Sequence, residues 1–280
     1  MTIRGSGGVS VMKFLYPSSF LKSTRVDEHF EDEVELLDTK PVLYSEYEDR
    51  LVLRGESLEG ETVVYRGWIV SADKYSRISD FVETAGGTML VSPVNYAKSQ
   101  FAEGWLNVFD GLIPETVVFP YEVSSQTLID SFADESSAYV VKGSSKSLKH
   151  DWDNSMFAKN GSDVVRVVDN FKSQVSCDEE SFILVRKFEN WVPGELRVWW
   201  VDDRFVVDQH PNNDHVVDFG EGFELFLNSV VKGYVNSLDA SFVTTDFVRD
   251  ENNGFRLVEV GNGQVSGAHD FTKIVELFRR

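Results

Sequence analysis

The stretch that decides the fold is residues 244–267, TTDFVRDENNGFRLVEVGNGQVSG. Two apolar runs flank RDENNG, whose turn-forming residues predict a hairpin loop between two strands. Each strand carries one carboxylate, Asp246 or Glu259, within an apolar run, where an unpaired charge is costly. Together with Asn262 they offer only hard oxygen ligands, the type that suits Mg²⁺ with bound phosphates. The alternative is that both carboxylates face solvent from their strands.

The segment before it, residues 186–197, reads RKFENWVPGELR. An expected strand runs into Pro193 and Gly194, and Glu195 and Arg197 then share one strand face because they are two positions apart. An extended hinge with aromatic neighbours can hold a flat base, and a carboxylate just beyond it can accept hydrogen bonds from ribose hydroxyls. The alternative is a simple bend between subdomains.

Further upstream, a predicted strand at residues 138–142 ends on a lysine and a polar loop, KGSSKSLKHD. Small residues after Lys142 let backbone N–H groups approach an anion, and Lys146 and Lys149 add positive charge. The pattern is not the Walker P-loop, since GxxxxGK[ST] is absent. The cluster indicates a polyphosphate site, and a solvated turn is the alternative.

The first half of the chain alternates between strand and helix patterns. Strands are predicted at residues 62–70, 88–91 and 116–119, and helices at 78–85 and 95–106. Strands separated by helices of this length predict a parallel α/β sheet, with a domain boundary near Pro120. The later part predicts hairpins, a helix over residues 164–171 and a strongly periodic helix over 221–238.

Composition restricts the possible functions. The 280 residues carry a net charge of −19, which disfavours extended nucleic-acid binding and anionic membranes but makes a local lysine cluster informative. Apolar runs are too short for a membrane span or a signal peptide, so a cytoplasmic location is expected. Cys177 is the single cysteine and is expected to be inert. Structural roles are expected for the six tryptophans and for His210, His215 and His269.

These segments occur in an order that resembles the ATP-grasp superfamily, nearest to the branch related to RimK-type amino-acid ligases, which includes many phage and bacterial proteins. The resemblance is carried by VVKGSS, LVRKFENWVPGELRV and the stretch 244–267, and extends over most of residues 12–270. It implies an α/β (α+β) fold in which two subdomains sandwich ATP. Residues 1–11 would be a flexible extension or tag remnant, 12–120 an N-terminal α/β domain, 121–194 a small ATP-grasp subdomain with a phosphate lid, and 195–280 a C-terminal subdomain with the Mg²⁺ site.

The resemblance also implies site residues, ATP and Mg²⁺. Lys142, with a catalytic role shared by Arg197, would contact the phosphates under the loop, and Glu195 would hold the ribose. The wider sets implied are, for the nucleotide, Ser144, Ser145, Lys146, Arg186, Lys187, Phe188 and Glu189; for the metal, Asp246, Glu259 and Asn262; and for the acceptor, Arg66, Ser18, Gln264 and Ser266.

Two departures from the family pattern stand out. A second family lysine has no counterpart between Pro120 and Lys142, and the family's Glu-x-Asn is here Glu259-Val260-Gly261-Asn262, one residue late. The implied activity is an ADP-forming ligase that activates a carboxylate as an acyl phosphate and joins it to an amine or similar nucleophile. The alternatives are modification of a protein or RNA end, or nucleotide binding without turnover. A homodimer is possible, and the acceptor cannot be named from the sequence.

Overall fold

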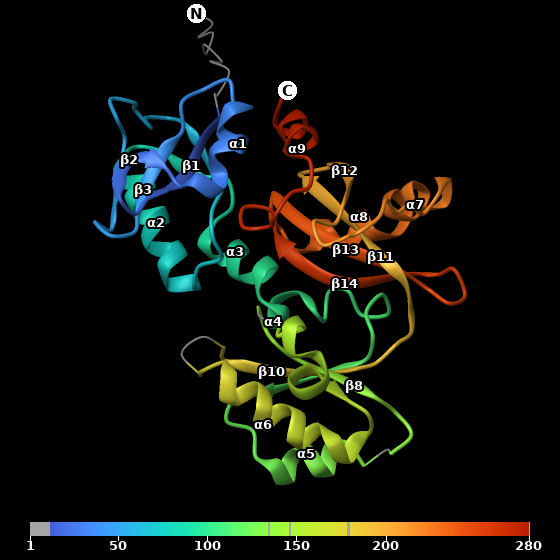
Figure 1. Ribbon diagram of the computed structural model, residues 1–280. Helices are drawn as coiled ribbons and strands as arrows, with labels where there is room; N and C mark the ends of the chain where they lie inside the picture. Colours follow the sequence, from blue (N-terminus) through green and yellow to red (C-terminus); the bar gives the residue numbers. More distant parts are fainter. Residues whose placement is uncertain (1–11, 134, 146, 178–179, 280) are drawn as a thin grey trace, which may run out of the picture.

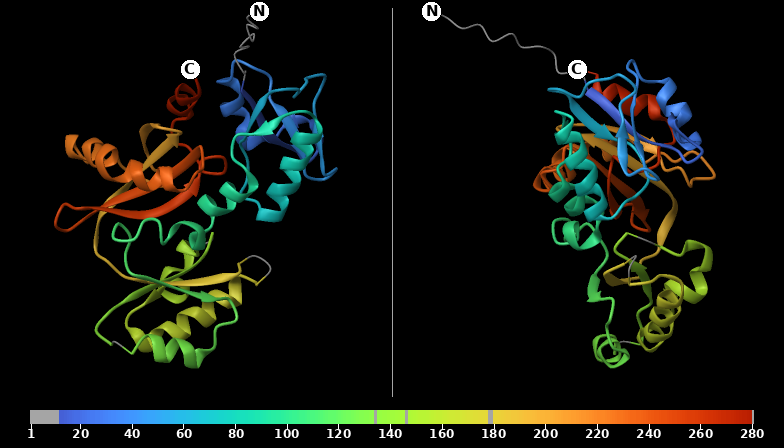
Figure 2. Two further views of the ribbon diagram at one scale, coloured as in Figure 1. Left: turned by 180° about the vertical axis from the view of Figure 1, so that it is seen from behind. Right: turned by 90° about the vertical axis from the view of Figure 1, so that its left-hand side faces the viewer.

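The computed structural model describes residues 12–133, 135–145, 147–177 and 180–279. Within these residues the strands form three sheets, which Figure 1 shows in three bodies. The N-terminal body and the C-terminal body lie side by side, and the middle of the chain forms the third body beneath them (Figures 1 and 2). The expected loop residue Lys146 and the expected extension 1–11 lie outside the described residues.

The first sheet has the strand order β4-β3-β1-β5-β6, with β2 paired to β1. Its central pairs, β1 with β3, β1 with β5 and β5 with β6, are parallel, as the alternating pattern predicts. The strands are β1 (Met12–Ser19), β2 (Lys22–Val26), β3 (Val42–Ser45), β4 (Arg50–Val52), β5 (Thr62–Tyr65) and β6 (Thr88–Met89).

Helix caps set the helix limits in this body. Helix α2 (Ala72–Thr84) begins earlier than expected because the Ser71 hydroxyl accepts a hydrogen bond from the N–H of Lys74, an N-cap contact. The helix expected over residues 95–106 is divided at Phe101, whose backbone is extended. The remaining helices here are η1 (Glu28–Phe30), α1 (Glu31–Glu35), α3 (Pro93–Gln100) and α4 (Ala102–Trp105).

The second sheet is antiparallel, in the order β7-β10-β8-β9. Strand β7 (Thr116–Pro120) was expected in the N-terminal parallel sheet, and this is wrong: it is an edge strand of the second sheet, with only Phe119 buried. Periodicity cannot distinguish a short edge strand from a buried parallel one. The other elements are β8 (Tyr139–Gly143), β9 (Phe157–Ala158), β10 (Phe182–Lys187), α5 (Ser125–Ser131), η2 (Lys149–Asp151), η3 (Trp152–Met156), η4 (Gly161–Asp163) and α6 (Val164–Gln174).

The third sheet, β12-β11-β13-β14, is also antiparallel and consists of the two hairpins that the sequence predicts. The periodic segment 221–238 is helical, with a π-helical turn in its middle. The elements are β11 (Trp191–Val201), β12 (Arg204–Gln209), α7 (Glu221–Phe226), η5 (Leu227–Val231), α8 (Lys232–Ser237), β13 (Phe242–Asp250), β14 (Phe255–Asn262) and α9 (Phe271–Phe278).

Packing leaves one face of two sheets free to meet. Helices α5 and α6 cover one face of the second sheet, and α7 and α8 cover one face of the third. The other face of the second sheet presents Val140, Lys142 and Arg186 toward β14 of the third. No helix among the described residues has the length and apolar character needed to cross a bilayer. The expected domain limits at 120 and 194 remain predictions.

Candidate functional site

Strand register brings three predicted site residues into one row on the third sheet. Arg197 on β11 lies opposite Asp246 on β13, and Asp246 lies opposite Glu259 on β14. Directly opposed residues in antiparallel strands point to the same face. Arg197 grips Asp246 through both carboxylate oxygens, at 2.8 Å from Nε to Oδ1 and 2.8 Å from Nη2 to Oδ2. The two predicted carboxylates therefore face the second sheet and not open solvent.

Lys142 meets this row from the opposite sheet. Its Nζ lies 3.3 Å from Oε1 of Glu259, a contact between residues 117 positions apart in sequence. Burial lowers the pKa of Lys142, and the charges of Arg186 and Lys149 lower it further against the attraction of Glu259. Burial alone would raise the pKa of Glu259, but Lys142, Lys149 and Arg186 outweigh it, so its pKa is lowered. The pair thus keeps Glu259 ionised next to concentrated positive charge.

A cavity of about 400 Å³, the first cavity, lies between the two sheets at this contact. Its basic wall is Lys142, Lys149 and Arg186, and its far end is apolar and aromatic. The full lining is Val140, Lys142, Ser147, Lys149, Trp152, Met156, Arg186, Lys187, Phe188, Glu189, Trp191, Glu195, Val258 and Glu259. Positive charge at one end and flat aromatic surface at the other suit a ligand that joins an anion to a planar ring.

Arg186 supplies a direct sign of a missing ligand. Its side chain is buried, Nη1 donates to the carbonyl of Val258 at 2.7 Å, and Nε donates to the Thr116 hydroxyl at 3.2 Å. Its Nη2 is buried without a hydrogen-bond partner and belongs to a residue that lines the first cavity. A buried donor without a partner is costly unless something else satisfies it. A phosphorylated or otherwise acceptor-rich ligand in this cavity would do so.

A second cavity of about 250 Å³ adjoins the first and shares Ser147, Lys149 and Glu259 with it. Arg197, Asp246 and Ser266 line this second cavity. The shared wall is the place where the two cavities could exchange a transferred group. The expected catalytic residues Arg197 and Lys142 therefore line neighbouring spaces joined at Glu259.

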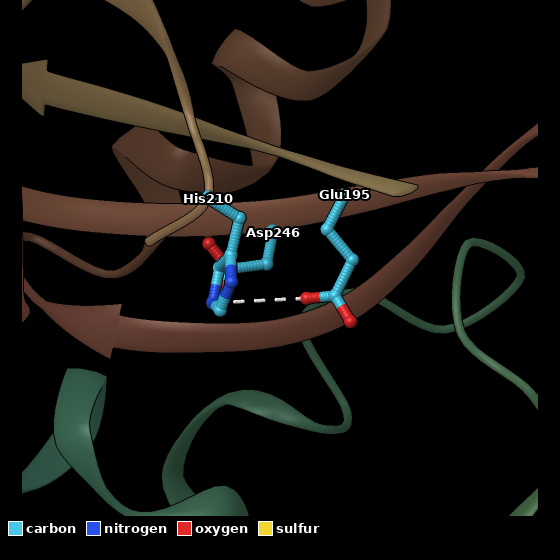
Figure 3. A group of neighbouring side chains, drawn as sticks. All are labelled: Glu195, His210 and Asp246. Atoms are coloured by element: carbon cyan, nitrogen blue, oxygen red, sulfur yellow. Dashed lines mark ion pairs between the residues drawn. The ribbon is translucent and has the colours of Figure 1, made fainter. Parts of the chain in front are cut away.

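Glu195, His210 and Asp246 form the one group of His, Cys, Asp and Glu side chains, among the residues described, whose ligand atoms lie within 4.8 Å of one another. Figure 3 shows the imidazole beside both carboxylates, with His210 Nε2 3.7 Å from each. Arg197 Nη2 also lies 3.0 Å from that nitrogen, so a guanidinium already compensates this cluster. Burial lowers the pKa of His210, which keeps its ring neutral at pH 7.

Asp246 and Glu259 fit a divalent cation, and Asn262 does not join them. Carboxylates accept through several lone pairs, so oxygen positions remain after the contacts to Arg197 and Lys142. Asn262 is fully buried on the opposite face of β14, where its Nδ2 donates to Ser99 Oγ at 2.7 Å and its Oδ1 accepts from the N–H of Gln264 at 3.1 Å. The expectation that Asn262 ligates Mg²⁺ is therefore wrong, because a shift of one residue turns a strand side chain to the other face.

The loop after Lys142 is held differently from the expected phosphate cradle. The N–H of Ser144 donates to Glu180 Oε2 at 2.7 Å, and the N–H of Ser145 donates to Glu180 Oε1 at 3.0 Å. These donors were expected to face phosphate, but a carboxylate of the chain itself occupies them. Ser147 and Lys149 do line the first cavity.

The predicted base and ribose residues gather at the far end of the first cavity. Lys187, Phe188, Glu189 and Glu195 all line it. The N–H groups of Lys187 and Phe188 donate to Glu115 and Ala138 carbonyls, both at 2.8 Å, so neither is free for a base. The carboxylate of Glu189 pairs with Arg256, whereas burial raises the pKa of Glu195, whose carboxylate lies at the cavity wall.

The predicted acceptor residues are divided. Ser266 lines the second cavity and also a third cavity, of about 530 Å³, together with Arg66. Arg66 is fully engaged in structure: it donates to both carboxylate oxygens of Glu33 and to the carbonyls of Gly263 and Ser266. Gln264 is buried between Tyr65 and Tyr75. Ser18 pairs with Val26 on the edge of the first sheet and lines none of these three cavities.

The sequence analysis did not identify several lining residues. Trp152, Met156 and Trp191 line the first cavity, and His210 lines the second. The tryptophans and His210 were expected to be structural. Glu180 was not singled out at all, because a lone acidic residue before a strand has no distinguishing pattern; its role depends on a turn that folds back onto it.

Comparison with known proteins agrees with this geometry. Residues 133–280 match a family model of the ATP-grasp domain, described as family 3 of its clade, and this match is more than half of the chain. A search of curated proteins gives no match.

Solved structures share the fold at low identity. A RimK domain ATP-grasp protein from Sphaerobacter thermophilus has a TM-score of 0.57 at 13% identity, covering 95% of each chain. D-cycloserine synthetase DcsG has a TM-score of 0.63 at 12% identity, covering 96% of this chain and 100% of its own. D-alanine–D-alanine ligase from Bacillus anthracis has a TM-score of 0.63 at 11% identity, covering 96% and 92%. The mixed α/β architecture with a cavity between two sheets is thus the ATP-grasp fold, and the chain belongs to the ATP-grasp domain family that the model describes.

Proposed function

We propose that the protein is an ATP- and Mg²⁺-dependent, ADP-forming ligase that joins a carboxylate to an amine or similar nucleophile. A carboxylate oxygen attacks the γ-phosphorus of ATP, the bond to the β–γ bridging oxygen breaks, and ADP leaves. The nucleophile then attacks the acyl carbon, the bond to phosphate breaks, and an amine nucleophile gives up a proton. The products are the amide, ADP and inorganic phosphate.

One observation carries this proposal. Lys142 on the second sheet and the Asp246–Glu259 pair on the third meet across a cavity, with Lys142 and Glu259 3.3 Å apart. A triphosphate in that place would have a cation on one side and metal-binding carboxylates on the other. Phosphoryl transfer depends almost entirely on such positioning and charge compensation.

The first cavity accounts for the nucleotide. Lys142, Ser147 and Lys149 would hold phosphate oxygens, and the unpartnered Nη2 of Arg186 would donate to an acceptor of the nucleotide. Phe188, Trp152 and Trp191 offer apolar and aromatic surface to the base. Glu195 stands near the aromatic end, where it would accept hydrogen bonds from ribose hydroxyls.

The second cavity accounts for the reacting centre. Mg²⁺ held by Asp246 and Glu259 would neutralise the phosphate charge that develops during transfer. Arg197, fixed by Asp246 and by the carbonyl of Gly267 at 2.7 Å, would keep a positive group at this centre. Burial lowers the pKa of Arg197, but Asp246 and neighbouring carboxylates outweigh this and raise it, so the guanidinium stays charged. The acceptor would enter past Ser266.

ADP release tests the proposal. Wild-type protein would be incubated with ATP, Mg²⁺ and pools of amino acids, peptides or RNA, and ADP would be measured. We expect release that requires an acceptor pool, and loss of about 10²-fold or more in Lys142→Met and Glu259→Gln, the scale for removing one preorganised charge contact. Glu224→Gln, on the exposed side of α7, is the matched control and should behave as wild type.

The pools separate the competing functions. Release with small amino acids alone supports the ligase, and release only with RNA or protein indicates modification of a macromolecular end. Nucleotide binding without release from any pool indicates a binding module, an alternative favoured by the absence of Asn262 from the metal pair. Absence of both binding and release contradicts all three.

A further inference from the structure

The turn that follows β8 is fastened to an internal carboxylate. Glu180 is 3% exposed and accepts four hydrogen bonds from two residues of the loop. The N–H of Ser144 donates at 2.7 Å, the N–H of Ser145 at 3.0 Å and 3.3 Å to the two oxygens, and the Ser145 hydroxyl at 2.8 Å. Consecutive N–H groups of this kind form an anion-binding nest, and Glu180 fills it.

Gly143 is needed for this contact. A Cβ at that position would lie 2.6 Å from the carboxyl carbon of Glu180 and 2.8 Å from its Oε1. The glycine of the KGSS sequence thus makes room for Glu180, since no side chain fits between the strand and the carboxylate. The small residues that resemble a phosphate loop therefore have a different ligand here.

The other side of the turn is also fixed. The N–H of Ala102, at the start of α4, donates to Ser144 Oγ at 3.0 Å, and Ser144 Oγ in turn donates to the Glu103 carboxylate. Ser144 is thereby held from two directions, by Glu180 and by α4. Neither Ser144 nor Glu180 lines the first cavity, whereas Ser147 and Lys149 do.

We infer that Glu180 is a positioning residue that fixes the stem of the loop, so that the nucleotide's phosphates are bound by Lys142, Ser147 and Lys149 and not by the N–H groups of Ser144 and Ser145. This inference rests on the proposed nucleotide site. It assigns the first part of the loop to an internal anion and the last part to the ligand.

Amide hydrogen exchange, resolved by NMR, tests the contact itself. In nucleotide-free protein, Glu180→Gln should speed exchange at Ser144 and Ser145 by about tenfold, the equivalent of weakening one charge-assisted hydrogen bond. The N–H groups of Asn252 and Gly254, which donate to Asp250 Oδ1 in a comparable turn, are internal controls and should not change. Equal exchange in wild type and variant would overturn the contact.

Repeating the exchange with saturating ATP and Mg²⁺ tests the assignment of the phosphates. If Glu180 remains the ligand of the turn, Glu180→Gln still speeds exchange at Ser144 and Ser145 with nucleotide bound. If phosphates take over these N–H groups, the two proteins exchange alike, and the inference fails.

A double-mutant cycle gives a readout that a general loss of stability would not produce. Glu180→Gln and Ser145→Ala should each weaken ATP binding, and their combination should weaken it no further than Glu180→Gln alone, because both break one contact. Additive losses would mean that Ser145 contacts the nucleotide independently. If wild type binds no nucleotide, the proposed function fails, while the nucleotide-free exchange still decides whether Glu180 fixes the turn.

Discussion

At the scale of residues, the site depends on four side chains that would each be unfavourable alone. Lys142, Arg186 and Asp246 are buried and Arg197 is nearly so, and their charges are compensated only because two sheets bring them together. Burial of an unpaired charge is costly, so the arrangement indicates selection for binding and not for stability. Residue types and strand context made these residues candidates, whereas their pairing depends on register.

Asn262 gives a prediction at this scale. Asn262→Ala should lower the free energy of unfolding by about 1–3 kcal/mol, because Ser99 and the Gln264 N–H lose a buried partner. The apparent affinity for Mg²⁺ in the presence of ATP should not change. Denaturant unfolding and a Mg²⁺ titration measure the two quantities. A weaker Mg²⁺ affinity with unchanged stability would restore Asn262 as a metal ligand.

At the scale of elements, the sequence was most informative where a pattern was long. The hairpins around Asp202 and residues 249–254 and the helical segment 221–238 could be predicted because their turn residues and periodicity are local. Strand β7 was misplaced because a short edge strand carries no signal of its partner. The Glu180 turn could not be predicted, since a backbone donor leaves no trace in side-chain patterns.

The centre of the third sheet offers a second prediction. The indole N–H of Trp200 donates to Thr245 Oγ1 at 2.9 Å, and both side chains are buried. Thr245→Val keeps the shape but leaves the indole without a partner, which should cost about 1–3 kcal/mol of unfolding free energy. Thr84→Val, at the exposed end of α2, is the control. Equal stability of both variants in denaturant would show that the hydrogen bond contributes nothing.

At the scale of the whole molecule, Arg66 joins the N-terminal body to the C-terminal one. It extends from the end of β5, pairs with Glu33 of α1, and donates to the carbonyls of Gly263 and Ser266 beyond β14. Its guanidinium also lies over Phe271 at 5.0 Å. The acceptor side of the site is therefore built on a buried arginine that connects two bodies.

The stability of this junction should depend on Glu33. Glu33→Gln leaves the Arg66 charge buried without its counter-ion and should cost about 3 kcal/mol in urea or guanidinium unfolding. Glu31→Gln, on the exposed side of the same helix, should have no effect. If the two variants unfold alike, Arg66 is not held mainly by Glu33, and a direct role with substrate becomes the better account.

The most direct test of the account is calorimetric titration of ATP in the presence of Mg²⁺ into wild type, Lys142→Met, Glu259→Gln and the Glu224→Gln control. The account predicts one site per chain in wild type and control, with affinity lower by about tenfold or more in the two site variants, the scale of one lost charge contact. Absence of binding to wild type, or equal binding by all four proteins, would contradict a nucleotide held between the second and third sheets.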